Sequence, residues 1–153
     1  MGHEATTLYS GTFERSMDAK KRVAVPATWL TKEKEEGEVF HVIGHPTEGY
    51  LVVMSPLELE NQQKTINENP NLNPSEKRIA TRRIFGNAQR VVTDKQGRVL
   101  LAEEHCKHAG LLDGAIIFVG GNTRFEIWSK TRFDTAAAAE MEVFKRISTD
   151  IGF

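Results

Sequence analysis

The feature that most constrains the fold of this chain is a short stretch that the sequence uses twice. The first copy runs from Asp18 to Pro26 as DAKKRVAVP, and the second runs from Asp94 to Ala102 as DKQGRVLLA. Both copies read D-x-x-x-R followed by an apolar run, so the two aspartates and the two arginines are separated by the same sequence offset. Aspartate readily begins a turn because its carboxylate bonds backbone N–H groups further along the chain. Each copy therefore predicts a basic turn between two strands that holds its arginine at the tip.

The similarity between the two halves extends beyond the motif to the order of the predicted elements. In the first half we expect strand, turn, strand, short helix, two strands and a helix, over residues 8–17, 18–21, 22–25, 27–34, 39–43, 50–54 and 55–66. In the second half the same order is predicted over residues 88–93, 94–97, 98–101, 103–108, 115–119, 124–128 and 130–147. A shared order of elements over this length indicates an internal duplication.

Two capped helices mark the junction between the halves. Ser55 and Asn73 each precede a proline and lie three residues before a glutamate, the pattern of a helix that begins with a capping box. The polar linker 67–72 separates these helices, so we place the first repeat at residues 8–72 and the second at 73–153. Two copies of so few strands cannot each bury a core. We therefore predict a β-rich α+β fold in which two pseudo-symmetric repeats interlock into one barrel with flanking helices.

Composition limits the classes of protein to which the chain can belong. Of its 153 residues, 39% are hydrophobic and 27% are charged, as in ordinary soluble globular proteins. The single cysteine, Cys106, excludes an internal disulfide framework and fits a reducing compartment. No apolar run approaches the roughly 20 residues that span a bilayer. The net charge of −1 means that any nucleic-acid site is a local basic patch.

Several motifs, taken together in their order and spacing, resemble the MraZ family of bacterial transcriptional regulators. They are the two D-x-x-x-R copies, RRIFGNA at 82–88, HAGL at 108–111 and RFEIW at 124–128. The resemblance implies an AbrB-like, swapped-hairpin fold in each repeat. It also implies a cytoplasmic, nucleoid-associated protein that binds double-stranded DNA at short direct repeats in a promoter, often that of its own division and cell-wall operon. Ring-like homo-oligomers, no catalysis, no cofactor and no membrane are expected for such a protein.

The resemblance assigns the two D-x-x-x-R turns to DNA, and the residue types suit that role. A guanidinium binds the O6 and N7 atoms of guanine, so Arg22 and Arg98 are the candidate base-reading residues. The aspartates four positions earlier would hold each guanidinium in place, and the lysines of the turns would contact phosphates. The candidate DNA-binding residues are thus Asp18, Lys20, Lys21, Arg22, Asp94, Lys95 and Arg98.

The two copies differ at the position before the arginine. The family usually has glycine there, as at Gly97, whereas the first copy has Lys21. A left-handed backbone at this position would cost a lysine about 1 kcal/mol relative to glycine. The first turn is also the more basic, because Lys20 stands where the second copy has Gln96.

Other clusters leave alternatives open. Residues 77–90 carry Lys77, Arg78, Arg82, Arg83 and Arg90 without an acid. This suits a second phosphate-binding stripe, a solvated helix face that links the two copies, or ion pairs between subunits, and we expect Ile79, Ile84 and Phe85 to be buried. The C-terminal helix has an apolar stripe that fits packing on its own barrel or on another subunit. We interpret 105–108, HCKH, as structural rather than as a zinc site, because too few ligands are near in sequence.

Two other classes of function compete with the regulator. The first is an AbrB-like protein-interaction module of the antitoxin type, which would keep the fold and act through a protein partner without a specific operator. A preference for an operator sequence separates it from the regulator. The second is an enzyme, but the sequence offers no nucleophile and base set, phosphate-binding loop or paired carboxylates, so we predict none, with no metal or cofactor.

Overall fold

A computed structural model describes residues 8–33, 35–112 and 114–153. Its strands are β1 (Thr12–Arg15), β2 (Arg22–Ala24), β3 (Val39–Gly44), β4 (Leu51–Met54), β5 (Gln89–Val92), β6 (Arg98–Leu100), β7 (Ile116–Gly120) and β8 (Phe125–Ser129). The α-helices are α1 (Pro56–Glu68), α2 (Pro74–Phe85), α3 (Glu103–Ala109) and α4 (Lys130–Ile147), and the short 3-10 helices are η1 (Ala27–Trp29) and η2 (Thr149–Ile151). The predicted mixture of strands and helices, and hence the α+β class, is confirmed.

Six strands form one antiparallel sheet in the order β1-β7-β8-β4-β3-β5, and β2 pairs with β6 in a separate two-stranded ribbon. Strands of the two halves lie side by side at β1–β7, β4–β8, β3–β5 and β2–β6. The register repeats the offset seen in the sequence: Phe13 lies opposite Phe118, and Gln89 lies opposite Val42. In sequence, Phe13 is separated from Gln89, and Val42 from Phe118, by the same offset that separates Asp18 from Asp94. One pair therefore matches the other when the first half of the chain is aligned with the second.

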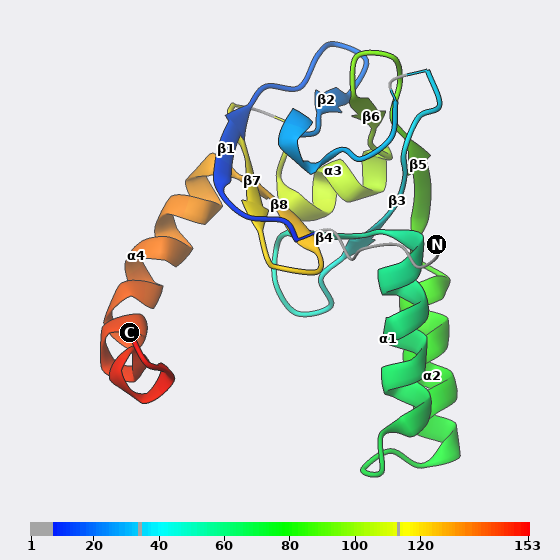
Figure 1. Ribbon diagram of the computed structural model, residues 1–153, viewed down its shortest axis with the longest axis vertical. Coiled ribbons are helices and arrows are strands. Elements are labelled where there is room, and N and C mark those ends of the chain that lie inside the picture. Colours follow the sequence, from blue (N-terminus) through cyan, green and yellow to red (C-terminus); the bar gives the residue numbers. More distant parts are fainter. Residues whose placement is uncertain (1–7, 34, 113) are drawn as a thin grey trace.

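The described strands do not close into a barrel. Within residues 8–33, 35–112 and 114–153, β1 and β5 form the two edges of the sheet, and the ribbon of β2 and β6 pairs only with itself. The ribbon lies at one end of the molecule (Figure 1). Its inward side chains Val23 and Val99 join the same buried cluster as Phe40 and Phe118 of the sheet. Packing of the ribbon against the sheet therefore encloses the core without a continuous ladder.

Aromatic rings fill the centre of this core. The ring of Trp29 lies 4.8 Å from that of Phe125 and 5.6 Å from that of Tyr9. Its indole Nε1 donates a hydrogen bond of 2.9 Å to the carbonyl of Ser10, so the one polar atom of a buried tryptophan is satisfied. These contacts tie the N-terminal segment to the sheet and hold the chain that leads out of the ribbon.

The helix predicted over 27–34 is wrong beyond its first turn. Only η1 forms, and Leu30 is extended, with φ −91° and ψ 133°. The physical reason is a competing acceptor: the carboxylate of Glu38 accepts the backbone N–H groups of Thr31 and Lys32 at 2.7 and 3.2 Å. Those donors are no longer available to an α-helix. Lys34, the last residue of the predicted helix, lies outside the described residues.

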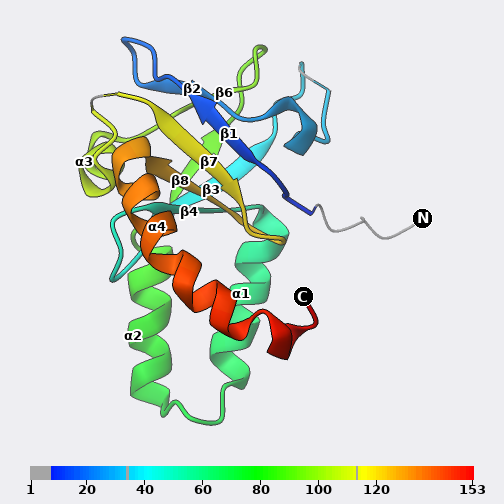
Figure 2. The same cartoon turned by 90° about the vertical axis from the view of Figure 1, so that its left-hand side faces the viewer.

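The long helices project away from the end that carries the ribbon. Figures 1 and 2 show the α1–α2 hairpin and α4 extending in the opposite direction. The predicted capping box of α2 is confirmed between Asn73 and Glu76. That of α1 is wrong, because Glu58 turns its carboxylate to Arg124, at 2.6 Å, while Ser55 alone caps the helix. None of the helices in the described ranges has the length and apolar character needed to cross a membrane.

Candidate nucleic-acid interface

The first D-x-x-x-R motif folds as a tight turn built around the carboxylate of Asp18. Oδ1 of Asp18 accepts the backbone N–H groups of Lys20 and Arg22, each at 2.9 Å, and Oδ2 accepts Nε of Arg22 at 2.8 Å. The backbone closes the turn, because Lys21 N–H donates to the carbonyl of Asp18 at 3.0 Å. One aspartate therefore both shapes the turn and holds the arginine, as predicted from the motif.

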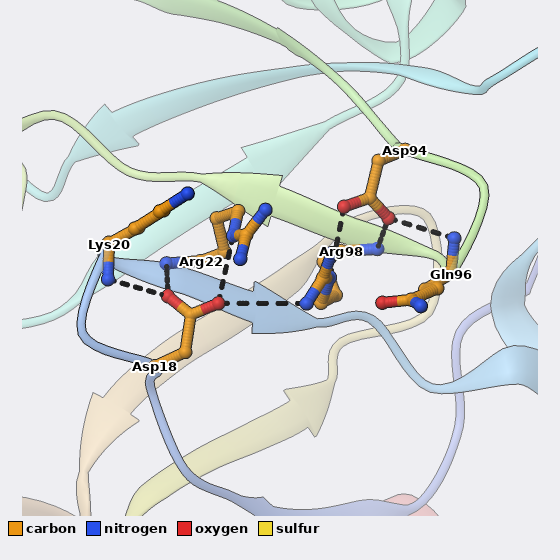
Figure 3. Close-up of polar contacts among 6 residues, drawn as sticks. All are labelled: Asp18, Lys20, Arg22, Asp94, Gln96 and Arg98. Atoms are coloured by element: carbon orange, nitrogen blue, oxygen red, sulfur yellow. Dashed lines mark hydrogen bonds and ion pairs between the residues drawn. The ribbon is translucent and has the colours of Figure 1, made fainter.

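The second motif repeats this arrangement bond for bond. Oδ1 of Asp94 accepts the N–H groups of Gln96 and Arg98, each at 2.9 Å, and Oδ2 accepts Nε of Arg98 at 2.9 Å. The N–H of Gly97 donates to the carbonyl of Asp94 at 2.9 Å. Figure 3 shows both turns, with their aspartates and arginines, on the ribbon.

The position before each arginine does have a left-handed backbone. Gly97 has φ +77°, and Lys21 has φ +64° in the equivalent place. The hydrogen bonds of the turn impose this conformation, which glycine adopts without strain and a lysine adopts at a cost of about 1 kcal/mol. The first turn therefore carries a strained backbone that the second avoids.

The pairing of β2 with β6 sets the direction of both arginines. Arg22 lies directly opposite Leu100, and Ala24 lies directly opposite Arg98, with Val23 and Val99 between them. Directly opposed residues of an antiparallel pair point to the same side, and successive residues alternate. Because Val23 and Val99 are buried, the outer face of the ribbon carries the two arginines, Leu100 and Ala24. We call these four residues, with the two turns, the ribbon face.

The two arginines belong to one surface and do not stand at two separate tips. Each begins its strand, and diagonal neighbours across an antiparallel pair lie about 7–8 Å apart. Nη1 of Arg98 lies 3.6 Å from Oδ2 of Asp18, the oxygen that also accepts Nε of Arg22 (Figure 3). Asp18 therefore faces both guanidinium groups. This differs from the expectation of one arginine at each turn tip, because strand pairing between the halves brings the two motifs together.

The hydrogen bonds of the turns also set the charge of the aspartates. The N–H of Arg22, followed by its guanidinium and the N–H of Lys20, holds the pKa of Asp18 below its usual value. For Asp94, partial burial acts to raise the pKa, but the N–H groups of Arg98 and Gln96 and the Arg98 guanidinium outweigh it and lower the pKa. Both carboxylates are therefore ionised at neutral pH, and each keeps its arginine oriented.

The lysines of the turns are not equivalent. Lys20 and Lys95 are exposed at the turns. Lys21 instead lies 3.7 Å from the carboxylate of Glu103 at the start of α3. Leu100, which sequence reasoning did not single out, is 55% exposed on the ribbon face, opposite Arg22. The signal was present in the sequence, because Leu100 lies two residues after Arg98 and so shares its side of the strand.

Most of the basic segment 77–90 lies away from the ribbon face, but Arg90 belongs to β5, where the side chain of its neighbour Gln89 donates to the carbonyl of Leu100 at 3.4 Å. Lys77, Arg78, Arg82 and Arg83 belong to α2, which projects from the opposite end (Figure 2). The prediction that its apolar residues are buried is wrong for Ile79 and Phe85, which are 50% and 38% exposed. Ile84 is partly buried and packs against the smaller core cluster of Ile43, Met54 and Leu59. The hairpin of α1 and α2 stands out from the core, so only one side of α2 has a neighbour.

The histidines of α3 have partners within the fold. Nδ1 of His105 lies 3.2 Å from Oε1 of Gln89, and Nε2 of His108 lies 3.0 Å from the carbonyl of Glu48. Burial lowers the pKa of His105, which favours its neutral form, and Cys106 is buried in the core. Among residues 8–33, 35–112 and 114–153, no group of three or more His, Cys, Asp or Glu side chains is placed to hold a metal ion.

Comparison of the sequence with known proteins assigns the chain to a family. Residues 84–153 match the family described as "MraZ protein, putative antitoxin-like". A protein named transcriptional regulator MraZ from Caldanaerobacter subterraneus subsp. tengcongensis is 32% identical, over 90% of this chain and 92% of its own length. Those from Nitratidesulfovibrio vulgaris, at 30% over 88% and 89%, and from a Thermoanaerobacter species, at 36% over 78% and 80%, bear the same name. Similarity at this level over nearly the whole length means that the chain belongs to the MraZ family.

Proposed function

We propose that this protein is a sequence-specific DNA-binding transcriptional regulator. Its target is a set of short direct repeats in a promoter, including that of its own division and cell-wall operon, in the cytoplasm at the nucleoid. The observation that carries the proposal is the ribbon face, on which two duplicated Asp–Arg pairs meet. Relatives named transcriptional regulator MraZ over almost the whole chain support the same class of function.

The ribbon face has the shape and chemistry for base reading. A two-stranded β-ribbon fits the major groove of B-DNA, which is about 12 Å wide. There each arginine is able to form two hydrogen bonds with a guanine, a contact worth about 1–3 kcal/mol of discrimination. Asp18 and Asp94 already hold Nε of their arginines, and Nη1 of Arg98 also lies 3.6 Å from Asp18, so the terminal nitrogens of Arg22 and Nη2 of Arg98 are the ones proposed to face the bases. Pre-orientation reduces the side-chain entropy that binding costs.

The lysines supply the part of the affinity that does not depend on sequence. Lys20, Lys21 and Lys95 flank the arginines on the turns, where phosphates border the groove. Such contacts fix the register of the protein on the duplex but do not select bases. We assign Asp18, Lys20, Lys21, Arg22, Asp94, Lys95 and Arg98 to the DNA site on this basis.

Self-association is part of the proposal, because a single ribbon face would contact only a few base pairs and bind DNA weakly. The helices that project from the opposite end expose several apolar side chains: Ile79, Phe85, Met141, Val143 and Phe144. Contacts between copies through these helices leave the ribbon face of each copy free. A ring-like homo-oligomer then engages several direct repeats at once, and avidity raises the affinity well above that of one site.

The duplication suggests how the site arose. We propose that residues 8–72 and 73–153 are two AbrB-like swapped-hairpin repeats, with their boundary in the loop between α1 and α2. The equivalence of the pairs Phe13–Phe118 and Gln89–Val42 under one sequence offset supports this. In this arrangement neither repeat forms the ribbon face alone, because β2 comes from one and β6 from the other.

A protein-interaction module of the antitoxin type is the second candidate, and the family description "putative antitoxin-like" favours it. It uses the same fold with a protein partner and without an operator. The two candidates differ in one measurable property, the preference for a DNA sequence.

The experiment is equilibrium binding to a duplex that carries the direct repeats from upstream of the protein's own gene. It compares that duplex with a scrambled one at two salt concentrations. We expect binding that prefers the repeats and weakens with salt, and we expect the double variant Arg22→Ala/Arg98→Ala to lose the preference while keeping its oligomeric state. The matched control, Arg78→Ala/Arg83→Ala, removes the same charge from α2 and should keep the preference.

Each outcome is informative. Loss in the ribbon variant alone supports the proposal. Loss in the α2 variant alone moves the site to α2. Equal, weak binding of the wild-type protein to both duplexes contradicts an operator and favours the protein-interaction module.

A further inference from the structure

The ribbon face is symmetric in its arginines but not in the residues opposite them. Arg22 lies opposite Leu100, whereas Arg98 lies opposite Ala24. Leu100 and Ala24 occupy equivalent places in the two copies, each two positions after the arginine of its motif. Only one half of the face therefore carries a large apolar side chain, and that side chain is 55% exposed.

An exposed leucine that lies opposite one arginine and two residues after the other is unusual on a surface that only contacts phosphates. Hydration of its exposed side chain is unfavourable. Its backbone is fixed by the β2–β6 pairing and by the N–H of Leu101, which donates to the carbonyl of Lys21 at 3.1 Å. The side chain thus stands at a fixed position on the face that meets the groove.

Thymine is the one base that presents an apolar group in the major groove, its 5-methyl. Directly opposed residues of an antiparallel pair have Cβ atoms about 5 Å apart, and base pairs stack at about 3.4 Å. A leucine beside an arginine that binds guanine therefore reaches the base pair next to that guanine, or one beyond it.

We infer that Leu100 is a specificity-determining residue that contacts the 5-methyl group of a thymine adjacent to the guanine bound by Arg22. This inference rests on the proposed DNA-binding function and sharpens it. Because Ala24 is too short to make the same contact beside Arg98, the face selects thymine on one side only. Each repeat then binds in one orientation, which suits direct repeats and does not suit palindromes.

The test uses the repeat-bearing duplex from upstream of the gene, with each thymine of a repeat replaced in turn by deoxyuridine. This exchange removes only the 5-methyl group. We expect wild-type protein to lose affinity at one thymine position, by about 4-fold per site, as for a single buried methyl group. Leu100→Ala should bind the unmodified duplex correspondingly more weakly and respond to no uracil position, while Leu100→Met should keep the response.

Three results overturn the inference. If wild-type protein prefers the repeats but tolerates every uracil, Leu100 does not read a methyl group and the proposed function stands. If the loss at one uracil persists in Leu100→Ala, another residue reads that methyl. If wild-type protein does not distinguish the repeats from scrambled DNA, the proposed function fails and this inference fails with it. Leu100 is exposed, so its variants should unfold at the wild-type denaturant midpoint, and the uracil scan on wild-type protein needs no variant.

Discussion

The turns at 18–22 and 94–98 share one set of hydrogen bonds, but they differ at the three positions between the aspartate and the arginine. In both, an aspartate accepts two backbone N–H groups and one arginine Nε. The first turn carries Lys20 and a strained Lys21, whereas the second carries Gln96 and the relaxed Gly97. The aspartate and the arginine therefore define the turn, and the positions between them are free to tune charge.

The turns also differ in their position in the network. Asp18 faces both arginines, at 2.8 Å to Arg22 and 3.6 Å to Arg98, whereas Asp94 pairs with Arg98 at 2.9 Å. The two turns therefore form one composite site with unequal halves. Variants of each half measure how unequal the halves are.

The largest effect is expected from removing either arginine of the proposed DNA site. Arg22→Ala and Arg98→Ala should each reduce the preference for repeat DNA over scrambled DNA by about 10- to 100-fold, because each loses one bidentate contact worth about 1–3 kcal/mol. Competition binding at constant salt measures this ratio. A variant that keeps the full preference would show that its half of the face does not read a base.

Substitutions at the left-handed position before each arginine, Lys21 and Gly97, should change the stability of the fold in opposite directions. Gly97→Ala places a Cβ at φ +77° and 3.2 Å from Cδ1 of Leu30, so we expect it to destabilise the fold by about 1 kcal/mol. Lys21→Gly relieves the backbone strain at φ +64° but raises the conformational entropy of the unfolded chain. Its net effect on the free energy of unfolding should therefore lie between zero and about 1 kcal/mol of stabilisation. Urea unfolding of both variants decides this, and a stabilising Gly97→Ala would contradict the account.

The shared carboxylate should make Asp18 the more important aspartate for specificity. Asp18→Asn weakens the hold on two guanidinium groups, whereas Asp94→Asn weakens the hold on one. Both pairs are about a third exposed, so solvent screens them and the loss of repeat preference should be only a few-fold. Competition binding should show the larger loss for Asp18→Asn, and equal losses would argue against the 3.6 Å contact of Arg98 with Asp18.

The smallest effect concerns the titration of the aspartates. Since their pKa values are lowered in the fold, their contribution is complete above the usual Asp value of about 3.9 and is lost only as the pH falls through the lowered values. Carboxyl carbon NMR should therefore show both side chains ionised at pH 5. Arg22→Ala should raise the pKa of Asp18 more than Arg98→Ala does, because the bonds from Arg22 are the shorter. A larger shift with Arg98→Ala would reverse that order.

Much of the architecture follows from local sequence signals. The D-x-x-x-R spacing predicted the aspartate-centred turns, and the Asn73 cap predicted the start of α2, because these interactions join residues a few positions apart. The composite face was not predictable, because it depends on the pairing of β2 with β6. No local pattern specifies a register between residues so far apart in the sequence.

Other misses have equally physical causes. The helix after β2 stops at Trp29 because Glu38, a carboxylate further along the chain, binds the next N–H groups. Ile79 and Phe85 are large apolar residues of a kind that is usually buried, yet α2 projects away from the core. Leu100 was overlooked because the alternation that places it beside Arg98 spans only three residues, Arg98–Leu100.

The central claim is that the two duplicated turns form one recognition face. The most direct test is a base-pair scan of one repeat with wild-type protein, Arg22→Ala and Arg98→Ala. If the arginines share one face, wild-type protein is sensitive at two guanine positions about two base pairs apart, and each variant becomes insensitive at a different one. If instead the turns bind separate repeats in equivalent ways, both variants lose sensitivity at the same position, and that result would contradict the account.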